Sequence, residues 1–460
     1  MADQLFRLST RIARPAAEVF AWHERPGALA RLCPPWEKVE LVSATGGVRD
    51  GARVVVRNRM GPVALDWHVE HRGYVAGREF RDVQLRGPFA RWEHLHRVEP
   101  DGPDACVLTD EIHYALPGGA LGRVLGGGFV RRQLTRLFTW RHATTRADLE
   151  AAAPSGPAAP LRVLLAGASG LVGSALAAFL QTQGHTVVRL VRRAARGPDE
   201  FSWDPAAGHL PAEALVGVDA VVNLGGTNIG AGRWTSARRD AIRRSRLEAT
   251  RTLASALSRS ARPPAVFVSA SAVGLYGDRG DAALDESAGV GAGFLAEVCR
   301  DWELAAGAVP AGVRVVSLRF GVVLSPAGGA LAKLLPVFRA GLGGPVGSGR
   351  QWMSWISVDD ALGAIRHVLL DPGCVGPVNA VSPGAVTNAE FSATLGRVLG
   401  RPSWMPVPAW ALRVLFGQMA DETLLASTRA VPGRLEATGY RFRHAALPQA
   451  LRHVLGAESA

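Results

Sequence analysis

Hydrophobic and polar positions follow two different patterns along the chain. From residue 161 onward, short runs of branched apolar residues alternate with longer amphipathic segments. A short apolar run is typical of a strand buried on both faces, and strands that alternate with helices indicate a doubly wound parallel sheet in an α/β fold. The predicted strands are Leu161–Ala166, Thr186–Val191, Asp219–Leu224, Ala265–Ser271 and Val313–Phe320, and the predicted helices include Thr235–Arg259 and Phe294–Gly307.

Residues 1–148 follow the other pattern, in which apolar and polar residues alternate over short segments separated by turns. Such alternation predicts antiparallel strands with one buried face. A helix-compatible segment, Pro15–His23, follows the first strand, and a longer one, Gly127–Leu149, ends this part. We expect an α+β domain in which the sheet curves around the long helix. The predicted strands are Phe6–Ile12, Val39–Val42, Ala52–Asn58, Ala64–Arg72, Glu79–Arg86, Ala90–Val98 and Ala105–Ala115.

The segment between the two patterns, AAAPSGPAAP at 151–160, consists of small residues and proline. Such a segment cannot bury a core and is expected to be a semi-extended linker. The sequence therefore predicts an N-terminal domain over 1–150, a linker over 151–160 and an α/β domain over 161–400.

Glycines at three-residue spacing follow the first strand of the α/β part, and an apolar helical run then ends at Gly184. In this order the glycines permit a tight turn, a close approach of backbone to a pyrophosphate and close packing of helix on strand, while the helix N-terminus faces the phosphates. The pattern predicts a dinucleotide site in a Rossmann-type sheet, and a glycine-rich loop without a ligand is the alternative. The candidate contacts are Gly167, Ser169, Gly170, Leu171, Val172 and Gly173.

Arginines crowd the end of the second strand of the α/β part, and no acidic residue occurs between Leu161 and Pro198. An NAD-preferring site would place a carboxylate here to bind the ribose hydroxyls. Guanidinium groups suit a 2′-phosphate instead, through charge-assisted bidentate bonds. We therefore predict NADP(H) as the cofactor, with exposed arginines that hold no ligand as the alternative. The residues are Arg189, Arg192, Arg193 and Arg196.

Further candidate contacts follow the next strand. Leu224 ends that strand and leads into Gly225 and Gly226. Ligands in open α/β sheets bind at the carboxyl edge, so this segment is expected to pass the adenine and ribose. Arg246, on the long basic helix, is a candidate to face the cofactor.

Composition limits the partners and the compartment. The net charge is +12, but no dense basic run with interleaved aromatics occurs, so we expect no nucleic-acid partner. Val163–Leu180 carries no charge over a membrane-spanning length, but the glycine turn breaks it, and we expect no membrane span. The cysteines form no C-x-x-C pair and the N-terminus lacks a signal pattern, so a cytoplasmic protein is expected. The cysteines are Cys33, Cys106, Cys299 and Cys374.

Two histidines stand out in the N-terminal part. His94 and His96, in the segment WEHLH, share one face of a predicted strand, as metal ligands would. No third ligand is apparent in the sequence. We interpret them as surface or cavity-wall histidines and predict no metal.

The spacing G-x-x-G-x-x-G resembles the extended short-chain dehydrogenase/reductase family, whose members include nucleotide-sugar epimerases and reductases. The segments NLGGTNI, SASAVGLYG and FLAEVCRDWE narrow the resemblance to an atypical, NADP-binding epimerase-family group, from about Leu161 to Gly456. The resemblance implies a small C-terminal helical module, which we place at 401–456. It also implies cofactor contacts at Arg192, Arg193, Leu224, Gly225, Arg246 and Val322.

The order of elements in the N-terminal part, with the opening ARPAAEVFAWHERPGALARLCPPW, resembles the polyketide-cyclase/START-like superfamily. The resemblance implies a helix-grip fold around an apolar cavity. An apolar ligand is therefore an expected partner of residues 1–150, beside a small-molecule substrate of the second domain.

Typical short-chain enzymes use a serine, a tyrosine and a lysine four residues after the tyrosine. Ser271 lies close to the position of the serine, and Tyr276 is a candidate acid on the loop that leaves the same strand. The Tyr-x-x-x-Lys pair is absent, because the only lysines are Lys38 and Lys333. Aligned through Glu303, the expected positions hold Leu295 and Cys299.

Three functions are consistent with these residues. The first is an NADP(H)-dependent oxidoreductase or epimerase-type enzyme that acts on a small carbonyl, a sugar or an apolar substrate. The second is a catalytically silent NADPH-binding protein that reports redox state. The third is a hydrophobic-ligand binder regulated by nucleotide.

Overall fold

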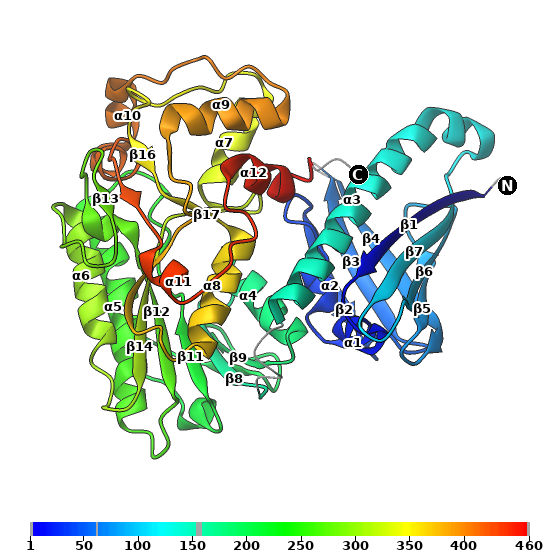
Figure 1. Ribbon diagram of the computed structural model, residues 1–460, viewed down its shortest axis with the longest axis horizontal. Helices are drawn as coiled ribbons and strands as arrows, with labels where there is room; N and C mark the ends of the chain where they lie inside the picture. The colour runs from blue at the N-terminus through cyan, green and yellow to red at the C-terminus, as the bar shows by residue number, and fades with distance from the viewer. Residues whose placement is uncertain (1–2, 61–62, 153–158, 458–460) are drawn as a thin grey trace. The chain divides into compact units, whose positions relative to one another are not determined.

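The computed structural model describes residues 3–60, 63–152 and 159–457 (Figure 1). The chain divides into two compact units, made chiefly of residues 1–157 and of residues 158–454. Each unit has its own sheet. Most of the predicted linker, residues 153–158, lies outside the described residues, and residues 151 and 152 end a helix.

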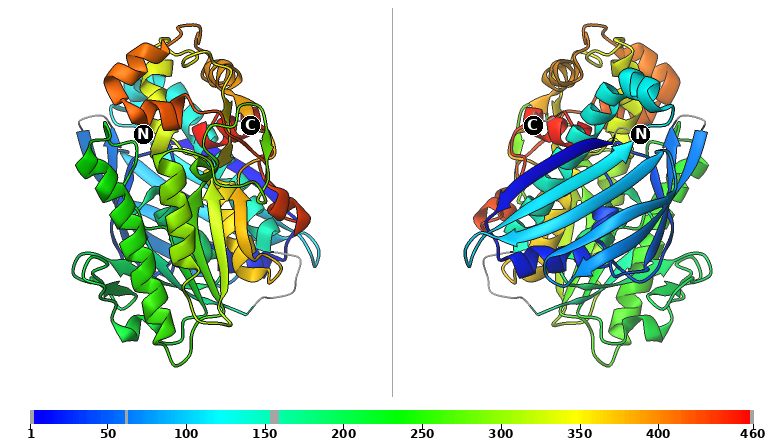
Figure 2. Two further views of the ribbon diagram at one scale, coloured as in Figure 1. Left: turned by 90° about the vertical axis from the view of Figure 1, so that its left-hand side faces the viewer. Right: turned by 90° about the vertical axis from the view of Figure 1, so that its right-hand side faces the viewer.

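The first unit is an antiparallel sheet of seven strands with a long helix after the last strand. Its strand order is β1-β7-β6-β5-β4-β3-β2, so that neighbours in sequence pair except where β1 joins β7. The right-hand panel of Figure 2 shows these strands side by side. The elements are β1 (Gln4–Ile12), α1 (Ala16–Glu24), α2 (Ala28–Arg31), β2 (Val39–Ala44), β3 (Arg53–Met60), β4 (Val63–Val75), β5 (Glu79–Arg86), β6 (Arg91–Pro100), β7 (Cys106–Ala115) and α3 (Gly119–Ala152).

Two apolar clusters hold the first unit together. One joins the sheet to α3 and contains Phe6, Ile112 and Phe138. The other joins the sheet to α1 and contains Phe20 and Phe80. Burying such side chains contributes about 1.5–3 kcal/mol each. The alternating strands therefore have one apolar face, and the helices cover it.

The second unit is built on a parallel sheet of seven strands in the order β10-β9-β8-β11-β12-β14-β18. Branched apolar residues fill its strands, and Leu164, Val188, Val221 and Phe267 of four strands belong to one buried cluster. The left-hand panel of Figure 2 shows α5 and α6 side by side along the sheet. The sheet strands are β8 (Arg162–Ala166), β9 (Thr186–Val191), β10 (Glu200–Ser202), β11 (Ala220–Asn223), β12 (Val266–Ala272), β14 (Arg314–Phe320) and β18 (Gly376–Ala380).

Helices and short strands lie between and after the strands of this sheet. The helices are α4 (Leu171–Thr182), η1 (Ala212–Leu215), α5 (Ser236–Ser258), η2 (Val273–Tyr276), α6 (Phe294–Ala306), α7 (Gly329–Arg339), α8 (Val358–Leu370), α9 (Asn388–Leu399), α10 (Ala409–Phe416), η3 (Ala420–Leu424), α11 (Gly433–Ala437) and α12 (Leu447–Leu455). The short strands are β13 (Ala283–Leu284), β15 (Val322–Leu324), β16 (Trp352–Met353), β17 (Trp355–Ser357), β19 (Val386–Thr387) and β20 (Arg429–Ala430).

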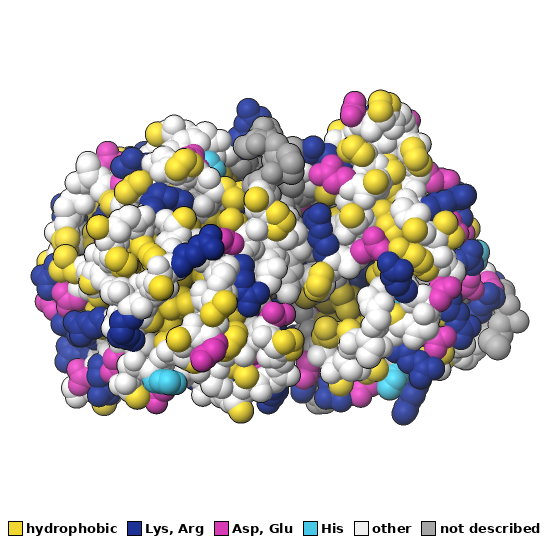
Figure 3. All heavy atoms as spheres, turned by 90° about the horizontal axis from the view of Figure 1, so that it is seen from below, with side chains coloured by type: hydrophobic (Ala, Val, Ile, Leu, Met, Phe, Trp, Pro, Cys, Tyr) yellow, Lys and Arg dark blue, Asp and Glu magenta, His cyan; other side chains and the backbone are white. Residues whose placement is uncertain are grey.

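The predicted fold class is confirmed: an α/β unit with a doubly wound parallel sheet follows an antiparallel α+β unit. Among the described residues, no helix combines the length and the apolar character needed to cross a bilayer. On the face drawn in Figure 3, Lys and Arg side chains alternate with Asp and Glu rather than forming one basic patch.

Candidate functional site

The glycine turn between β8 and α4 is closed by its own backbone. The Gly170 amide donates to the carbonyl oxygen of Gly167 at 3.0 Å, and Gly167 has a φ of 81°, which favours glycine. A Cβ on Gly167 would lie 2.7 Å from the carbonyl carbon of Leu224, and one on Gly173 would lie 2.1 Å from the oxygen of Gly167. Glycine is therefore required at both ends of the turn. Between them Ser169 and Gly170 are exposed, so the turn can receive a phosphate.

Of the predicted arginines, Arg189 lies within β9, which pairs with β8, and the others follow this strand. Arg192 and Arg193 are both exposed. Arg193 is held by Glu200 of β10, with two hydrogen bonds of 2.8 Å from its Nη1 and Nη2. Hydrogen bonds from Arg193 lower the pKa of the Glu200 carboxyl to about 2. Arg192 forms no ion pair with any described carboxylate, so its charge is available for a ligand.

Leu224 lies directly beside the glycine turn. Its amide donates to the carbonyl oxygen of Ala166 at 3.0 Å, which extends the β8–β11 pairing by one residue. The amide of Gly225 donates to the Asn223 side chain at 3.1 Å. Leu224 and Gly225 are half-buried and Gly226 is exposed. The segment that was expected to pass the adenine and ribose therefore lies at the carboxyl edge next to the turn.

Two further predicted contacts lie on neighbouring elements. The Arg246 guanidinium stands close to Gly226, donates to the carbonyl oxygen of Thr227 at 3.1 Å and packs over the Trp302 ring at 5.1 Å. Burial lowers the pKa of Arg246. Val322, in β15, donates its amide to the Ser354 carbonyl oxygen at 2.8 Å and is half-buried. Arg246 thus lies by the same edge of the sheet as the turn.

Ser271 is part of a buried hydrogen-bonded network. Its Oγ donates to Oε1 of Glu303 on α6 at 2.6 Å, and Glu303 accepts two more bonds, of 2.9 and 2.8 Å, from Arg319 on β14. Burial alone would lower the pKa of Arg319, but the hydrogen bonds and charge of Glu303 raise it. Ser271 is therefore orientated by an ion pair that ties β12, β14 and α6 together.

Tyr276 belongs to the same network from its other end. Its side chain is fully buried, and its hydroxyl donates to Asn379 Oδ1 at 2.7 Å and accepts from Arg319 Nη1 at 2.9 Å. Burial raises the pKa of the Tyr276 hydroxyl, so it stays protonated at neutral pH. These contacts fit packing and loop positioning better than proton transfer to a ligand.

The positions at which the resemblance to short-chain enzymes implies a tyrosine and a lysine hold Leu295 and Cys299 on α6. Cys299 is buried, and burial raises the pKa of its thiol to about 11. A protonated thiol supplies no positive charge to a neighbouring hydroxyl. Lys333, on α7, donates to the carbonyl oxygen of Gly230. Within the described part of the chain, no lysine therefore takes over the missing role at Tyr276.

Comparison with known proteins shows the family to which this chain belongs. A model of the NAD dependent epimerase/dehydratase family matches residues 163–379. An epimerase family protein of Mycobacterium bovis is 47% identical over 290 residues, which is 63% of this chain and 96% of the relative. This chain belongs to the epimerase family. Human SDR39U1, also described as an epimerase family protein, is 37% identical over 64% of this chain and all of its own length.

Two solved structures of relatives are similar to this chain, the first over nearly all of it and the second over part of it. A nucleoside-diphosphate sugar epimerase from Corynebacterium glutamicum is 34% identical, with a TM-score of 0.80, and the match covers 98% of this chain and 90% of that one. The structure of human SDR39U1 was solved with NADPH; it is 37% identical, with a TM-score of 0.60, over 64% of this chain and 99% of that one.

Two further family models match the parts that flank the epimerase-family match. A model described as polyketide cyclase / dehydrase and lipid transport matches residues 4–150. A domain of unknown function matches residues 407–454. The epimerase-family part of this chain is therefore fused to a START-like unit, as the resemblance implied.

Sequence reasoning missed three residues that shape this site. Glu200 and Glu303 each engage an arginine, and Arg319 links Ser271 to Tyr276. Glu200 could have been found, because it follows Arg193 after seven residues and the last arginine of the cluster after four. Glu303 is one of several charged residues of α6, and its pairing with Arg319 depends on how α6 packs against β14.

Proposed function

We propose that this chain binds NADP(H) at the carboxyl edge of the parallel sheet. The glycine turn would hold the pyrophosphate, and Leu224 to Gly226 would pass the adenine and ribose. Arg192 and Arg193 would hold the 2′-phosphate. The exposed, unpaired charge of Arg192 at the end of β9 is the observation that carries the proposal. The NADPH in the human relative's structure supports it.

Cofactor affinity tests this proposal. NADPH should bind more tightly than NADH by a few kcal/mol, on the scale of about 1.5–3 kcal/mol for each charged hydrogen bond. Arg192→Ala and Arg193→Ala should each remove part of that difference and the double variant most of it, as measured by calorimetry. Arg262→Ala, before the start of β12 at the opposite edge, is the matched control. Equal affinities for NADPH and NADH in the unmodified chain would refute the assignment.

We further propose that the chain exchanges hydride between NADP(H) and a small carbonyl or sugar substrate. Bound nicotinamide would supply or accept the hydride, and the proton that accompanies it would be exchanged with water. Ser271, at the carboxyl end of β12, would orient a substrate carbonyl oxygen by turning its hydroxyl proton from Glu303 Oε1 toward that oxygen. The description of the Corynebacterium relative as a nucleoside-diphosphate sugar epimerase supports a sugar.

Oxidation of NADPH in the presence of carbonyl compounds tests this chemistry. Because Tyr276 is buried and no lysine assists it, turnover should be slow, and Tyr276→Phe should lower it only modestly. Ser271→Ala should lower it more. Fast turnover that collapses in Tyr276→Phe and survives Ser271→Ala would show that the two roles are reversed.

A second candidate is an NADPH-binding protein without turnover, such as a redox reporter. The observation that favours it is the engagement of both Ser271 and Tyr276 within one buried network. Tight NADPH binding, with no oxidation of the bound NADPH by any carbonyl compound, would select this function.

All four cysteines lie among the described residues and are free, which supports a reducing compartment such as the cytoplasm.

The third candidate places a hydrophobic ligand in the START-like unit, regulated by nucleotide. The match of residues 4–150 to a family described by lipid transport supports it. A fluorescent apolar probe that binds the full chain, with an affinity that changes when NADPH is added, would favour this function.

A further inference from the structure

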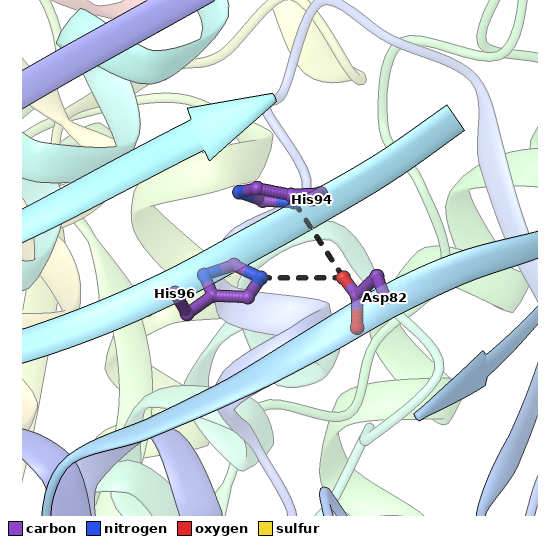
Figure 4. A group of neighbouring side chains, drawn as sticks. All are labelled: Asp82, His94 and His96. Atoms are coloured by element: carbon purple, nitrogen blue, oxygen red, sulfur yellow. Dashed lines mark hydrogen bonds and ion pairs between the residues drawn. The ribbon is translucent and has the colours of Figure 1, made fainter. Parts of the chain in front are cut away.

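A cluster of histidines and aspartates lies inside the first unit, and nothing in the proposed cofactor function uses it. Its members come from four strands and a helix, and the side chains of all but Asp82 are nearly fully buried. Figure 4 shows Asp82 of β5 pointing toward His94 and His96 of β6. The cluster comprises His71, Asp82, His94, His96, Asp110 and His142.

Strand register brings these side chains to one face of the sheet. Asp82 lies opposite His71 of β4 on one side and opposite His94 of β6 on the other. His96 lies two residues after His94 and opposite Asp110 of β7. Residues at period two and residues directly opposite share a face. The face is the one covered by α3, which adds His142.

The two histidines each present one ring nitrogen to Asp82. Asp82 Oδ2 is 3.2 Å from His96 Nε2 and 3.6 Å from His94 Nδ1, and one ligand atom of each residue lies within 4.8 Å of the other two. Ligand atoms on a tetrahedral zinc ion lie roughly 3.3 Å apart, given zinc bonds of about 2.0–2.1 Å. The three atoms are therefore spaced as ligands of one ion.

The other ring nitrogen of each histidine contacts Asp110. Asp110 Oδ1 lies 2.7 Å from His96 Nδ1 and 2.8 Å from His94 Nε2. Histidines that bind a metal donate their remaining N–H to a carboxylate in this way, which fixes the tautomer. When the N–H of each ring is directed at Asp110, the nitrogens that face Asp82 are free to coordinate an ion, which would take the place of the hydrogen bond between His96 Nε2 and Asp82 Oδ2.

The other oxygen of Asp82 supports the same conclusion. Asp82 Oδ1 lies 2.7 Å from His71 Nδ1, yet neither atom has a hydrogen-bond partner among the described residues. The two atoms lie at hydrogen-bond distance but without an aligned proton, so Asp82 Oδ1 is left without a hydrogen bond. A buried polar atom that remains unpaired costs about 1–3 kcal/mol.

Charge balance points the same way. Asp82 and Asp110 are two carboxylates in the interior of the unit, and their ion-pair partners among the described residues are all histidines. Two negative charges need compensation, and a divalent ion supplies both.

We propose that Asp82, His94 and His96 bind a divalent transition-metal ion, with Asp110 as the carboxylate that orients both histidines. Two imidazoles and one carboxylate suit zinc and ferrous iron, and such a set leaves a coordination position for water or for a ligand oxygen. The side chain of Asp82 is 23% exposed, which gives the site a route to solvent.

Metal titration of the full chain without an affinity tag tests the proposal. After treatment with a chelator and dialysis, the chain should take up one equivalent of zinc by calorimetry. Cobalt(II) should give visible absorption bands of four- or five-coordinate metal, and ferrous iron is tested anaerobically in parallel. A second candidate group, His367, Asp371 and Cys374, lies in the other unit, so each titration is repeated in a Cys374→Ser background.

Substitutions assign the ligands. Asp82→Asn, His94→Gln and His96→Gln should each weaken zinc binding at least 100-fold, and Asp110→Asn by about 10–100-fold. The matched control is His113→Gln on β7, because His113 pairs with Glu111 at the surface. Circular dichroism of each variant checks its fold.

Two measurements on the unmodified chain keep the proposal refutable if a variant fails to fold. X-ray absorption of the zinc-loaded chain should show only nitrogen and oxygen neighbours, and a sulfur neighbour would assign the metal to Cys374 instead. Absence of stoichiometric binding, or a melting temperature that neither chelator nor metal changes, would show that protons alone hold the cluster. Zinc affinity unchanged in folded Asp82→Asn and His96→Gln would also overturn the assignment.

Discussion

Loss of the Glu303 charge should destabilise the second unit locally and strongly. Glu303 accepts three hydrogen bonds, one from Ser271 and two from Arg319, and the side chains of Glu303 and Arg319 are 17% and 8% exposed. Breaking a buried ion pair by removing one partner costs about 3–5 kcal/mol. Glutamine keeps one acceptor oxygen, so Glu303→Gln should cost roughly 3 kcal/mol.

Hydrogen exchange followed by mass spectrometry measures this cost where it arises. A chain of two units has no single unfolding free energy, so we compare opening free energies for peptides from β12, β14 and α6. The matched control on α6 is Glu297→Gln, because Glu297 pairs with Arg243 at exposed positions, 57% and 36%. That variant should cost less than about 1 kcal/mol.

A double-mutant cycle isolates the pair. Glu303→Gln and Arg319→Gln should be non-additive, with an interaction energy of about 2 kcal/mol, because each single variant leaves an unpaired buried group. The predicted role of the pair would be refuted if Glu303→Gln lowered the opening free energies no more than Glu297→Gln does. It would also be refuted if the effects of Glu303→Gln and Arg319→Gln were additive.

Three further predictions concern other parts of the chain. Gly173→Ala places a Cβ 2.1 Å from the Gly167 oxygen, so it should lower both the melting temperature and the NADPH affinity, and unchanged values would contradict the turn geometry. Glu200 has its pKa lowered from 4.5 to about 2, so its pair with Arg193 stabilises the fold above pH 4.5 and loses this effect as pH falls toward 2. Acid denaturation of Glu200→Gln should lack this contribution, and identical acid profiles would contradict it. A fragment ending at Ala151 should fold alone and bind apolar probes; an insoluble fragment would count against the START-like interpretation.

The fold could be predicted from the sequence because the patterns that indicate it are local. Short apolar runs, a glycine turn and amphipathic helices are each contained within a few residues, and they predicted the order of elements in both units. The start of α3 was harder to predict. The sequence predicted a helix from Gly127, whereas α3 begins at Gly119. The glycines at 126–128 are poor helix formers, so the pattern gave no sign that the helix extends to the residues before them.

The contacts within the polar sites were harder to predict, because they depend on how neighbouring strands pair. Asp82 and His94 are directly opposite on paired strands, yet nothing local relates them, so His94 and His96 had no visible third partner. Ser271 and Arg319 are likewise register partners on β12 and β14. The arginines after β9 were visible as a cluster, but the engagement of Arg193 by Glu200 required the β9–β10 pairing.

The shared carboxylate of Glu303 has an evolutionary consequence. Glu303 and Arg319 form one electrostatic unit to which Ser271 donates, and loss of either charged member strands the charge of the other in the interior. Intermediate sequences that lost only Glu303 or only Arg319 would fold poorly, so relatives should keep both or exchange them together for apolar residues. Joint substitution at these positions among relatives would be the historical trace of the network.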